Sequence, residues 1–147
     1  MKKAGLVLSV MGALAAVAAT LGVVAVSAAL AAAGTGPAVT VQIKTKSKTL
    51  KDVVVHGEKG WITKDGAAKD RCSGDSGAGA LDAATHGKWS GKWYGGSLDD
   101  FLVNSILGVK PKSPDFWELF VNGKSASSGI CHVKLRAHET ILFKIAK

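Results

Sequence analysis

The strongest constraint on the fold is a predicted β-hairpin in the C-terminal third of the chain. Residues 116–121 (FWELFV) alternate as a strand does and are rich in aromatic and β-branched side chains. They run directly into Asn122-Gly123, a dipeptide that favours the type I′ hairpin turn because both positions accept a positive φ. A short return of small residues follows over residues 124–130. We expect the rest of the fold to be built on this densely apolar segment.

Alternating apolar residues predict further strands before and after the hairpin. The predicted strands cover residues 39–44, 50–56, 101–107 and 140–145. In the last of them, three apolar side chains two residues apart share one face, as expected of a strand that covers a core. Residues 57–71 are polar and glycine-containing, so we expect a loop there, with at most a short strand at Trp61-Ile62.

One helix is predicted, from Gly77 to His86. Asp75 or Ser76 is placed to cap its N-terminus through a side-chain oxygen, and Gly87 to supply the left-handed residue after its end. Two glycines inside the helix lower its intrinsic stability by about 1 kcal/mol each relative to alanine. Only tertiary packing can hold such a helix, so we expect it to lie across a sheet.

Residues 1–33 have the pattern of a secretory signal peptide. A basic start, Met1-Lys2-Lys3, precedes an uncharged run rich in alanine, valine and leucine that ends in an A-x-A motif at residues 31–33. An uncleaved membrane anchor is the alternative, because the apolar run is long enough to span a bilayer. Both interpretations predict a secreted or extracytoplasmic (cell-envelope) protein with one domain, residues 34–147. Membrane contact is then expected only through residues 1–33, if they are retained.

The predicted domain is basic. Without Lys2 and Lys3 it carries 17 basic side chains (19 minus 2) and 11 acidic ones, a net charge of +6. Its one run of lysines spans residues 44–51 and is interpreted as a solvated strand edge, because exposed lysines prevent unwanted strand pairing. The positive charge could also attract the domain to anionic envelope polymers or lipid headgroups, and this attraction would not depend on a specific sequence motif. We expect no nucleic-acid partner.

Residues 71–78 (RCSGDSGA) resemble the nucleophile loop of trypsin-like serine proteases, with Ser76 as the nucleophile. Such a triad needs a histidine base and a buried aspartate in register with the serine. The only upstream histidine is His56, 20 residues away (76 minus 56), which is too close for two barrels to form between them. We therefore expect no enzymatic activity, and a serine hydrolase using Ser76 is kept as an alternative.

Cys72 and Cys131 are the two cysteines of the chain. In a secreted domain they are expected to form a disulfide, which would stabilise the fold by roughly 4 kcal/mol through the loop that it closes. Metal binding through the Cys131-His132 dipeptide and another histidine is the alternative. Since no CxxC, HxxxH or carboxylate cluster accompanies the dipeptide, we expect no metal. The other histidines are His56, His86 and His138.

Trp89, Trp93 and Tyr94 lie in a predicted glycine-rich loop after the helix. Exposed rings of this kind stack on sugars or planar ligands. Burial over the end of the helix and the edge of the core is the competing interpretation, because a small domain needs its aromatic residues for its core.

Three segments carry a family resemblance: Leu81-Asp82-Ala83, residues 101–108 with the sequence NSILG, and residues 117–124 (WELFVNGK). From residue 38 to residue 146 the chain resembles the transcobalamin-like C-terminal domain. This β-grasp-type unit is classified as a domain of unknown function and also occurs in secreted and cell-wall bacterial proteins. The resemblance implies an α+β fold with a β-grasp-like mixed sheet of four to five strands and one helix packed across it.

The same resemblance bears on the cysteines and on the ligand. Cys72 and Cys131 match a pair often seen in actinobacterial members, which supports the bridge. In the vitamin carriers the domain caps cobalamin that a separate helical barrel mainly holds. This sequence contains no such barrel, so cobalamin is implied by the resemblance alone and we expect no cofactor. Residues 137–139 (AHE) depart from the Gly-Asp turn that members show before the last strand.

The resemblance also implies a ligand surface. In it, the domain presents its hairpin tip and the loop after the helix towards a partner. Here these are Asn122 to Lys124 and Trp89 to Tyr94, so the predicted surface comprises Trp89, Trp93, Tyr94, Asn122 and Lys124. We expect a monomeric, non-catalytic binding module for a small molecule or a cell-envelope component. A structural envelope protein without a small ligand is the alternative.

Overall fold

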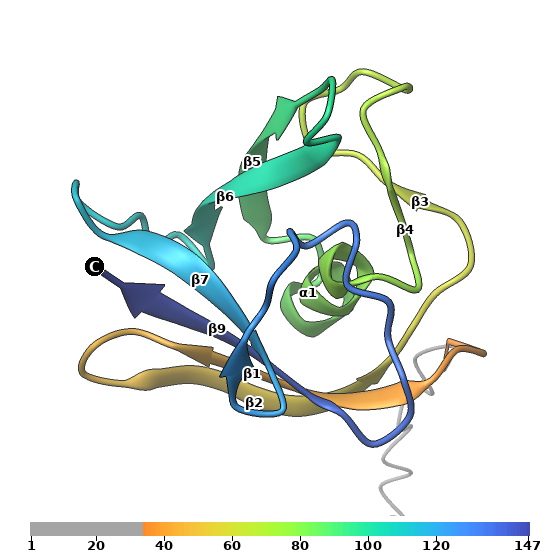
Figure 1. Cartoon of the computed structure of the whole chain (residues 1–147). Helices are drawn as coiled ribbons and strands as arrows, with labels where there is room; N and C mark the ends of the chain where they lie inside the picture. The colour runs from red at the N-terminus through yellow and green to blue at the C-terminus, as the bar shows by residue number, and fades with distance from the viewer. Residues whose placement is uncertain (1–33) are drawn as a thin grey trace, which may run out of the picture.

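The computed structural model describes residues 34–147, which form one mixed β-sheet, one helix and two small two-stranded sheets (Figure 1). The predicted signal peptide or anchor, residues 1–33, lies outside the described residues. Within the described part, no helix has the length and apolar character needed to cross a bilayer.

The main sheet has five strands in the order β2-β1-β9-β7-β8. Strands β1 and β9 are parallel, and the other neighbours are antiparallel. The prediction of a mixed sheet with a single helix is therefore confirmed, although the chain as a whole is predominantly β. The bounds of the strands are β1 Ala38–Lys44, β2 Thr49–His56, β7 Phe116–Val121, β8 Lys124–Ser125 and β9 Thr140–Ala146.

The predicted hairpin forms with the predicted turn. Asn122 and Gly123 have φ angles of 49° and 79°, the two positive values that a type I′ turn requires, and Val121 pairs with Lys124 across it. The Asn122 side chain also fixes the turn to the next strand, because its Oδ1 accepts a hydrogen bond of 2.9 Å from the Thr140 N–H. The return strand β8 is only two residues long.

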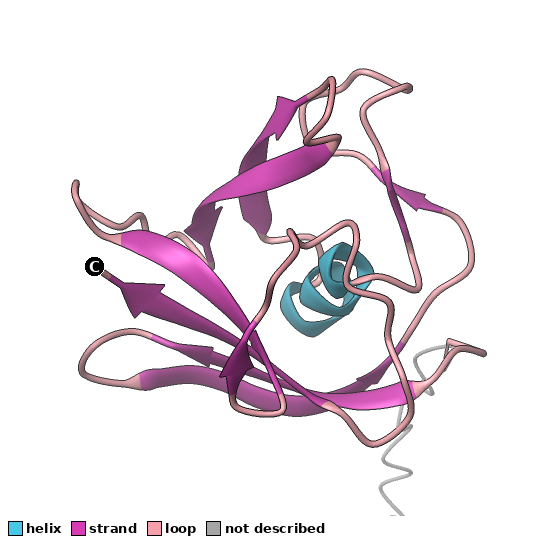
Figure 2. Ribbon diagram, viewed as in Figure 1, coloured by secondary structure: helices cyan, strands magenta, loops and turns pink. Residues whose placement is uncertain are grey.

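Helix α1, Gly77–Thr85, lies against one face of the main sheet (Figure 2). Alternate residues of β1, β7 and β9 point to this face and form the core together with the small residues of the helix. A Cβ at Gly79 would collide with the backbone of Gly74, so this glycine permits a close approach that alanine would block. The core side chains on the three strands are Val39, Val41, Ile43, Trp117, Leu119, Ile141, Phe143 and Ile145.

The ends of the helix differ from the prediction. Ser76 occupies the N-cap position, but its hydroxyl donates to the Ser73 carbonyl at 2.6 Å and makes no side-chain cap. The prediction of a side-chain cap at Ser76 is therefore wrong: the hydroxyl is directed back to the turn before the helix and accepts no hydrogen bond from a helix N–H. At the other end His86 is already left-handed, with a φ of 51°, so the helix ends one residue earlier than predicted.

Two small sheets flank the helix. Strand β5, Trp89–Tyr94, pairs antiparallel with β6, Asp100–Ile106, and β3, Trp61–Ile62, pairs with β4, Cys72–Ser73. The prediction that residues 89–94 form a loop is wrong. Pairing with β6 extends this segment. The register shifts between Ser90 and Gly91, which pair with Ser105 and Val103, so Asn104 of β6 is the extra residue of a bulge.

Candidate functional site

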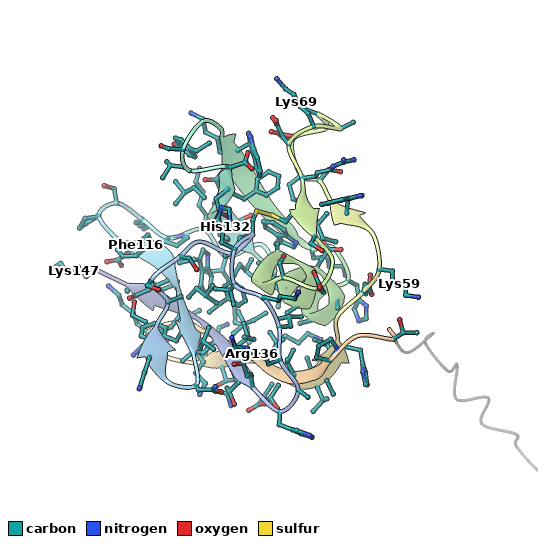
Figure 3. All side chains as sticks on the ribbon, turned by 45° about the vertical axis from the view of Figure 1, so that its right-hand side comes forward. Lys59, Lys69, Phe116, His132, Arg136 and Lys147 are labelled. Atoms are coloured by element: carbon teal, nitrogen blue, oxygen red, sulfur yellow. A yellow bond between two sulfur atoms is a disulfide. The ribbon has the colours of Figure 1, made fainter. Side chains whose placement is uncertain are left out.

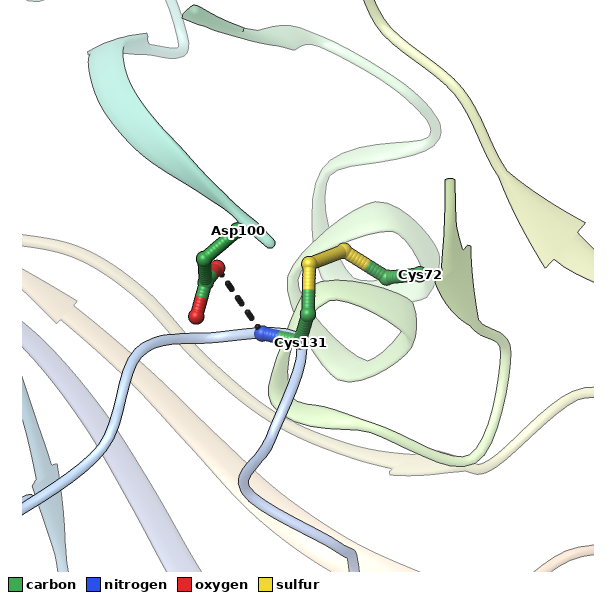
Figure 4. A group of neighbouring side chains, drawn as sticks. All are labelled: Cys72, Asp100 and Cys131. Atoms are coloured by element: carbon green, nitrogen blue, oxygen red, sulfur yellow. Dashed lines mark hydrogen bonds between the residues drawn. A yellow bond between two sulfur atoms is a disulfide. The ribbon is translucent and has the colours of Figure 1, made fainter. Parts of the chain in front are cut away.

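The disulfide predicted between Cys72 and Cys131 is confirmed, with a Cα–Cα distance of 4.8 Å. Cys72 begins β4, close to the start of the helix, and Cys131 lies in the long connection between β8 and β9 (Figure 4). The bridge thus holds this connection against the helix side of the fold.

Asp100 lies beside the disulfide, although no sequence pattern identified it. Its Oδ1 accepts hydrogen bonds from the Phe101 N–H at 2.7 Å and from the Cys131 N–H at 3.1 Å (Figure 4). The side chain is buried, with 9% of its surface exposed, and Oδ2 has no hydrogen-bond partner among residues 34–147. An unpaired buried polar atom is costly and therefore needs an explanation.

Burial raises the pKa of the Asp100 carboxyl above its ordinary value. The two backbone N–H groups and the charge of His132 act in the opposite direction, while the negative charge of Asp99 adds to the increase. The carboxyl group is therefore held in surroundings that disfavour its charged form.

Gly129 covers the unpaired oxygen. A Cβ at this position would collide with Asp100 Oδ2, so glycine is the residue that allows the connection to lie so close. Residues 127–129 are exposed and contain no helix or strand. Asp100 Oδ2 is therefore covered by the short, exposed segment 127–129, which has no side chain where it contacts the oxygen.

An open groove of about 520 Å³ extends from this point along β6. One wall is apolar, because Leu98 and Leu102 are 60% and 48% exposed and Tyr94 lies beside them. The opposite wall comes from the connection between β8 and β9, and His132 joins the two by a hydrogen bond of 3.0 Å from Nε2 to the Leu98 carbonyl. The residues that line the groove are Tyr94, Ser97, Leu98, Asp100, Phe101, Leu102, Ser127, Ser128, Gly129 and His132.

The donor atoms of Cys72, Asp100 and Cys131 lie within 4.8 Å of one another, which raises the question of a metal site. The two sulfur atoms are bonded to each other, whereas the thiolate is the form of cysteine that binds metals. With the disulfide intact, this donor set does not fit a metal ion.

The aromatic part of the predicted ligand surface is divided between core and surface. Trp89 is buried, with 6% of its surface exposed, and its Nε1 donates to Asp82 Oδ1 at 2.8 Å. Trp93 is half-buried and its ring packs edge-on against Phe101 at 4.8 Å. Of the three rings, Tyr94 is the one that is exposed, and it lines the groove.

The hairpin part of the predicted ligand surface lies elsewhere. Asn122 and Lys124 are exposed at the turn that follows β7. In Figure 1 this turn is at the bottom of the view, whereas the tip of the β5–β6 hairpin is at the top. The structure does not bring the two parts of the predicted surface together.

Ser76 is buried, with 2% of its surface exposed. Its hydroxyl donates to the Ser73 carbonyl, and none of the hydrogen bonds within residues 34–147 joins it to a histidine. The arrangement therefore offers Ser76 neither a base nor access to a substrate, which removes the geometric support for the hydrolase alternative.

Sequence reasoning missed Asp100, Leu98 and Gly129, and it considered His132 only as a metal ligand, because these residues meet only in space. Asp99 and Asp100 follow a glycine- and serine-containing stretch and look like ordinary turn residues. One local signal was available, since Asp100 directly precedes the apolar residues of a predicted strand and could be expected to share their burial.

The comparisons with known proteins concern mainly the fold. A family profile described as "Domain of unknown function (DUF4430)" matches residues 77–147. No curated protein sequence matches the chain.

Two solved structures share the fold. A candidate metal-binding protein from Ruminococcus gnavus aligns with a TM-score of 0.51 and 8% identity, over 76% of this chain and 97% of its own. Haptocorrin in complex with Cbi aligns with a TM-score of 0.52 and 16% identity, over 76% of this chain. The alignment covers 25% of haptocorrin, so the chain corresponds to a quarter of that protein. The chain therefore has a transcobalamin-like fold.

Proposed function

We propose that residues 34–147 form a non-catalytic, extracytoplasmic binding module whose ligand lies in the groove along β6. The observation that carries the proposal is the combination, in one groove, of an exposed apolar wall and a buried carboxyl oxygen without a partner. Small-molecule sites have this composition: mostly apolar surface with a few polar groups that orient the ligand. The groove volume of about 520 Å³ is in the range of such sites.

The chemistry of the groove suggests a ligand with an apolar part and a hydrogen-bond donor. Leu98, Leu102 and Tyr94 would cover the apolar part. A donor on the ligand would satisfy Asp100 Oδ2 once the exposed segment 127–129 moves aside, and an ammonium group would do so most strongly. A negatively charged ligand would meet the carboxylate unfavourably.

Two further observations support an extracytoplasmic binding module. The disulfide is typical of proteins that fold in an oxidising compartment. The two similar structures are described by what they bind, a metal in one and Cbi in the other. We do not extend either ligand to this chain, because the disulfide removes the thiolates and because haptocorrin is four times longer than the aligned part.

Saturation-transfer NMR with three small probes tests the proposal. Benzylamine, benzamide and benzoate share one ring and differ in charge and donors. We expect benzylamine to bind best and benzoate least. The variant Leu98→Asn removes apolar surface without adding charge and should weaken binding, whereas Val54→Asn, at a comparably exposed position on β2, should not. Benzylamine binding that is unchanged in Leu98→Asn, or no preference among the probes, would contradict the proposal. Absence of binding by all three probes would favour a structural envelope protein.

A further inference from the structure

A second groove, of about 360 Å³, lies between the β1–β2 turn and the connection that leads into β7. Lysines line it from both sides: Lys46 and Lys48 from the turn, and Lys110 and Lys112 from the connection. Of these four lysines, two belong to the run of lysines at residues 44–51. The other two, Lys110 and Lys112, lie more than sixty positions later in the chain.

The charges in this groove are largely uncompensated. Lys46 forms a salt bridge of 2.6 Å with Asp115, the one acidic residue that lines the groove. Lys48, Lys110 and Lys112 are exposed and form no salt bridge within residues 34–147. Three positive charges therefore face one another across a concave surface, where opposite charge from solution is attracted most strongly.

The backbone that carries these lysines is ordered. In the β1–β2 turn, Thr45 Oγ1 accepts hydrogen bonds from the N–H groups of Ser47 and Lys48, at 3.3 Å and 3.1 Å. In the connection, the Asp115 N–H donates to the Lys112 carbonyl at 2.8 Å. The backbone positions from which the lysines extend are thus held by hydrogen bonds, so binding does not have to order the backbone.

Two further lysines lie on the strands that end beside the groove, although neither of them lines it. Lys44 and Lys144 lie directly opposite each other on the parallel pair β1 and β9. Like charges in this relationship destabilise a sheet unless a counter-charge is near, and Glu118 on β7 faces only Lys144. Figure 3 shows Lys147 at the left of the view, Lys59 at the right and Lys69 at the top.

The position of the groove favours a soluble polymer over a lipid surface. Strand β1 begins near Gly34, where the described chain starts, and ends at Lys44 beside the groove. In Figure 1 the β1–β2 turn and the first described residues lie at opposite ends of the sheet. If the segment before residue 34 anchors the domain, the groove therefore lies at the end of the sheet that is farther from the anchor.

We propose that this groove binds an extended polymer of phosphate groups. The four lining cations are all lysines, and lysine binds phosphate as a compact point charge without the planar fork that arginine offers to carboxylates. Successive phosphates of an extended chain would neutralise Lys48 and then Lys110 and Lys112 on the opposite wall. This binding is independent of the groove along β6.

Fluorescence anisotropy of labelled polyphosphate with the full chain tests the proposal. The triple variant Lys48→Gln, Lys110→Gln, Lys112→Gln should bind at least about tenfold more weakly than the wild type at low salt, because three phosphate contacts are lost. The slope of log K against log salt should become smaller in magnitude by about 2. The matched control Lys59→Gln, Lys69→Gln, Lys88→Gln has the same net charge and should lose less than about twofold, because distant exposed charges act only through the overall field.

Four results would overturn the proposal. The first is an equal loss of affinity in the two triple variants, which would show that net charge alone attracts the polymer. The second is binding of polyglutamate as tight as that of polyphosphate, which would exclude phosphate recognition.

The third is lysine-dependent binding to phosphatidylglycerol vesicles without binding to polyphosphate, which would identify a membrane surface as the partner. The fourth is unchanged polyphosphate affinity in the groove variant with benzylamine binding along β6 intact, which would leave the proposed function standing alone.

Discussion

Asp100 accepts a hydrogen bond of 3.1 Å from the backbone N–H of Cys131, so a residue at the start of β6 fixes the residue that forms the disulfide. The bond crosses 31 positions of sequence and uses one carboxyl oxygen. The other oxygen has no partner among residues 34–147 and faces Gly129. Asp100 therefore links the groove along β6 to the disulfide that crosslinks the fold.

Removal of the disulfide should destabilise the domain. The double variant Cys72→Ser, Cys131→Ser should lose roughly 4 kcal/mol of unfolding free energy, because a loop of 59 residues is released in the unfolded chain. Urea denaturation monitored by tryptophan fluorescence measures the change. Peptide mapping without reductant should recover the two cysteines cross-linked. Free thiols in wild-type protein purified without reductant, or unchanged stability of the variant, would contradict the prediction.

A side chain at position 129 should be poorly tolerated. Gly129→Ala should cost about 1–3 kcal/mol of unfolding free energy, because the new Cβ collides with Asp100 Oδ2. The neighbouring exposed substitution Ser128→Ala is the control and should stay within about 0.5 kcal/mol of the wild type. Combining Gly129→Ala with Asp100→Ala should cost less than the sum of the single changes, since the collision is then absent. Strict additivity would show that the two residues do not touch.

The stability of the domain should depend on pH through Asp100. Its pKa is raised in the folded state, so the folded protein binds this proton more tightly than the unfolded chain does. The stabilising contribution of the protonated carboxyl is complete below the ordinary pKa and is lost as the pH rises through the raised value. Asp100→Asn cannot titrate. The unfolding free energy of the wild type relative to Asp100→Asn should therefore fall as the pH rises from about 3 to about 8. A difference that stays constant over this range would contradict the raised pKa.

Trp89 should behave as a core residue. Trp89→Ala should cost about 3–5 kcal/mol of unfolding free energy, since the ring is buried and contacts Phe101 edge-on. Trp61→Ala is the matched control: this ring is 60% exposed and its main interaction is with the Arg71 guanidinium 4.2 Å away. It should cost no more than about 1 kcal/mol. Equal losses in the two variants would contradict the burial of Trp89.

The parts of the fold that the sequence predicts are those set by local chemistry. The dipeptide Asn122-Gly123 specifies the type I′ turn, and the alternation of apolar and polar residues along β1, β7 and β9 determines which side chains enter the core. Strand β5 was missed because its serine, glycine and lysine indicate a loop when read alone. Pairing with β6 converts it into a strand, and that contact is not encoded in residues 89–94 themselves.

The candidate site was harder to predict because its members are distant in sequence. Asp100 and Gly129 meet only after the β8–β9 connection folds back over β6, and neither residue type signals such a contact. The Ser76 hydroxyl donates to the Ser73 carbonyl and does not cap the helix, and this orientation depends on the backbone geometry of the turn. Lys46 and Lys48 were visible as a run, whereas their proximity to Lys110 and Lys112 required the sheet.

Titration of ¹⁵N-labelled protein with benzylamine tests the central claim most directly, because two amide protons report on Asp100. The N–H groups of Phe101 and Cys131 donate to Asp100 Oδ1, so a ligand that binds Oδ2 must change both of their chemical shifts. We predict saturable shifts at these two amides and at Leu98 and Gly129, all lost in Asp100→Asn. Saturable binding that leaves the Phe101 and Cys131 amides unchanged, or no binding at all, would contradict the assignment of this groove as the ligand site.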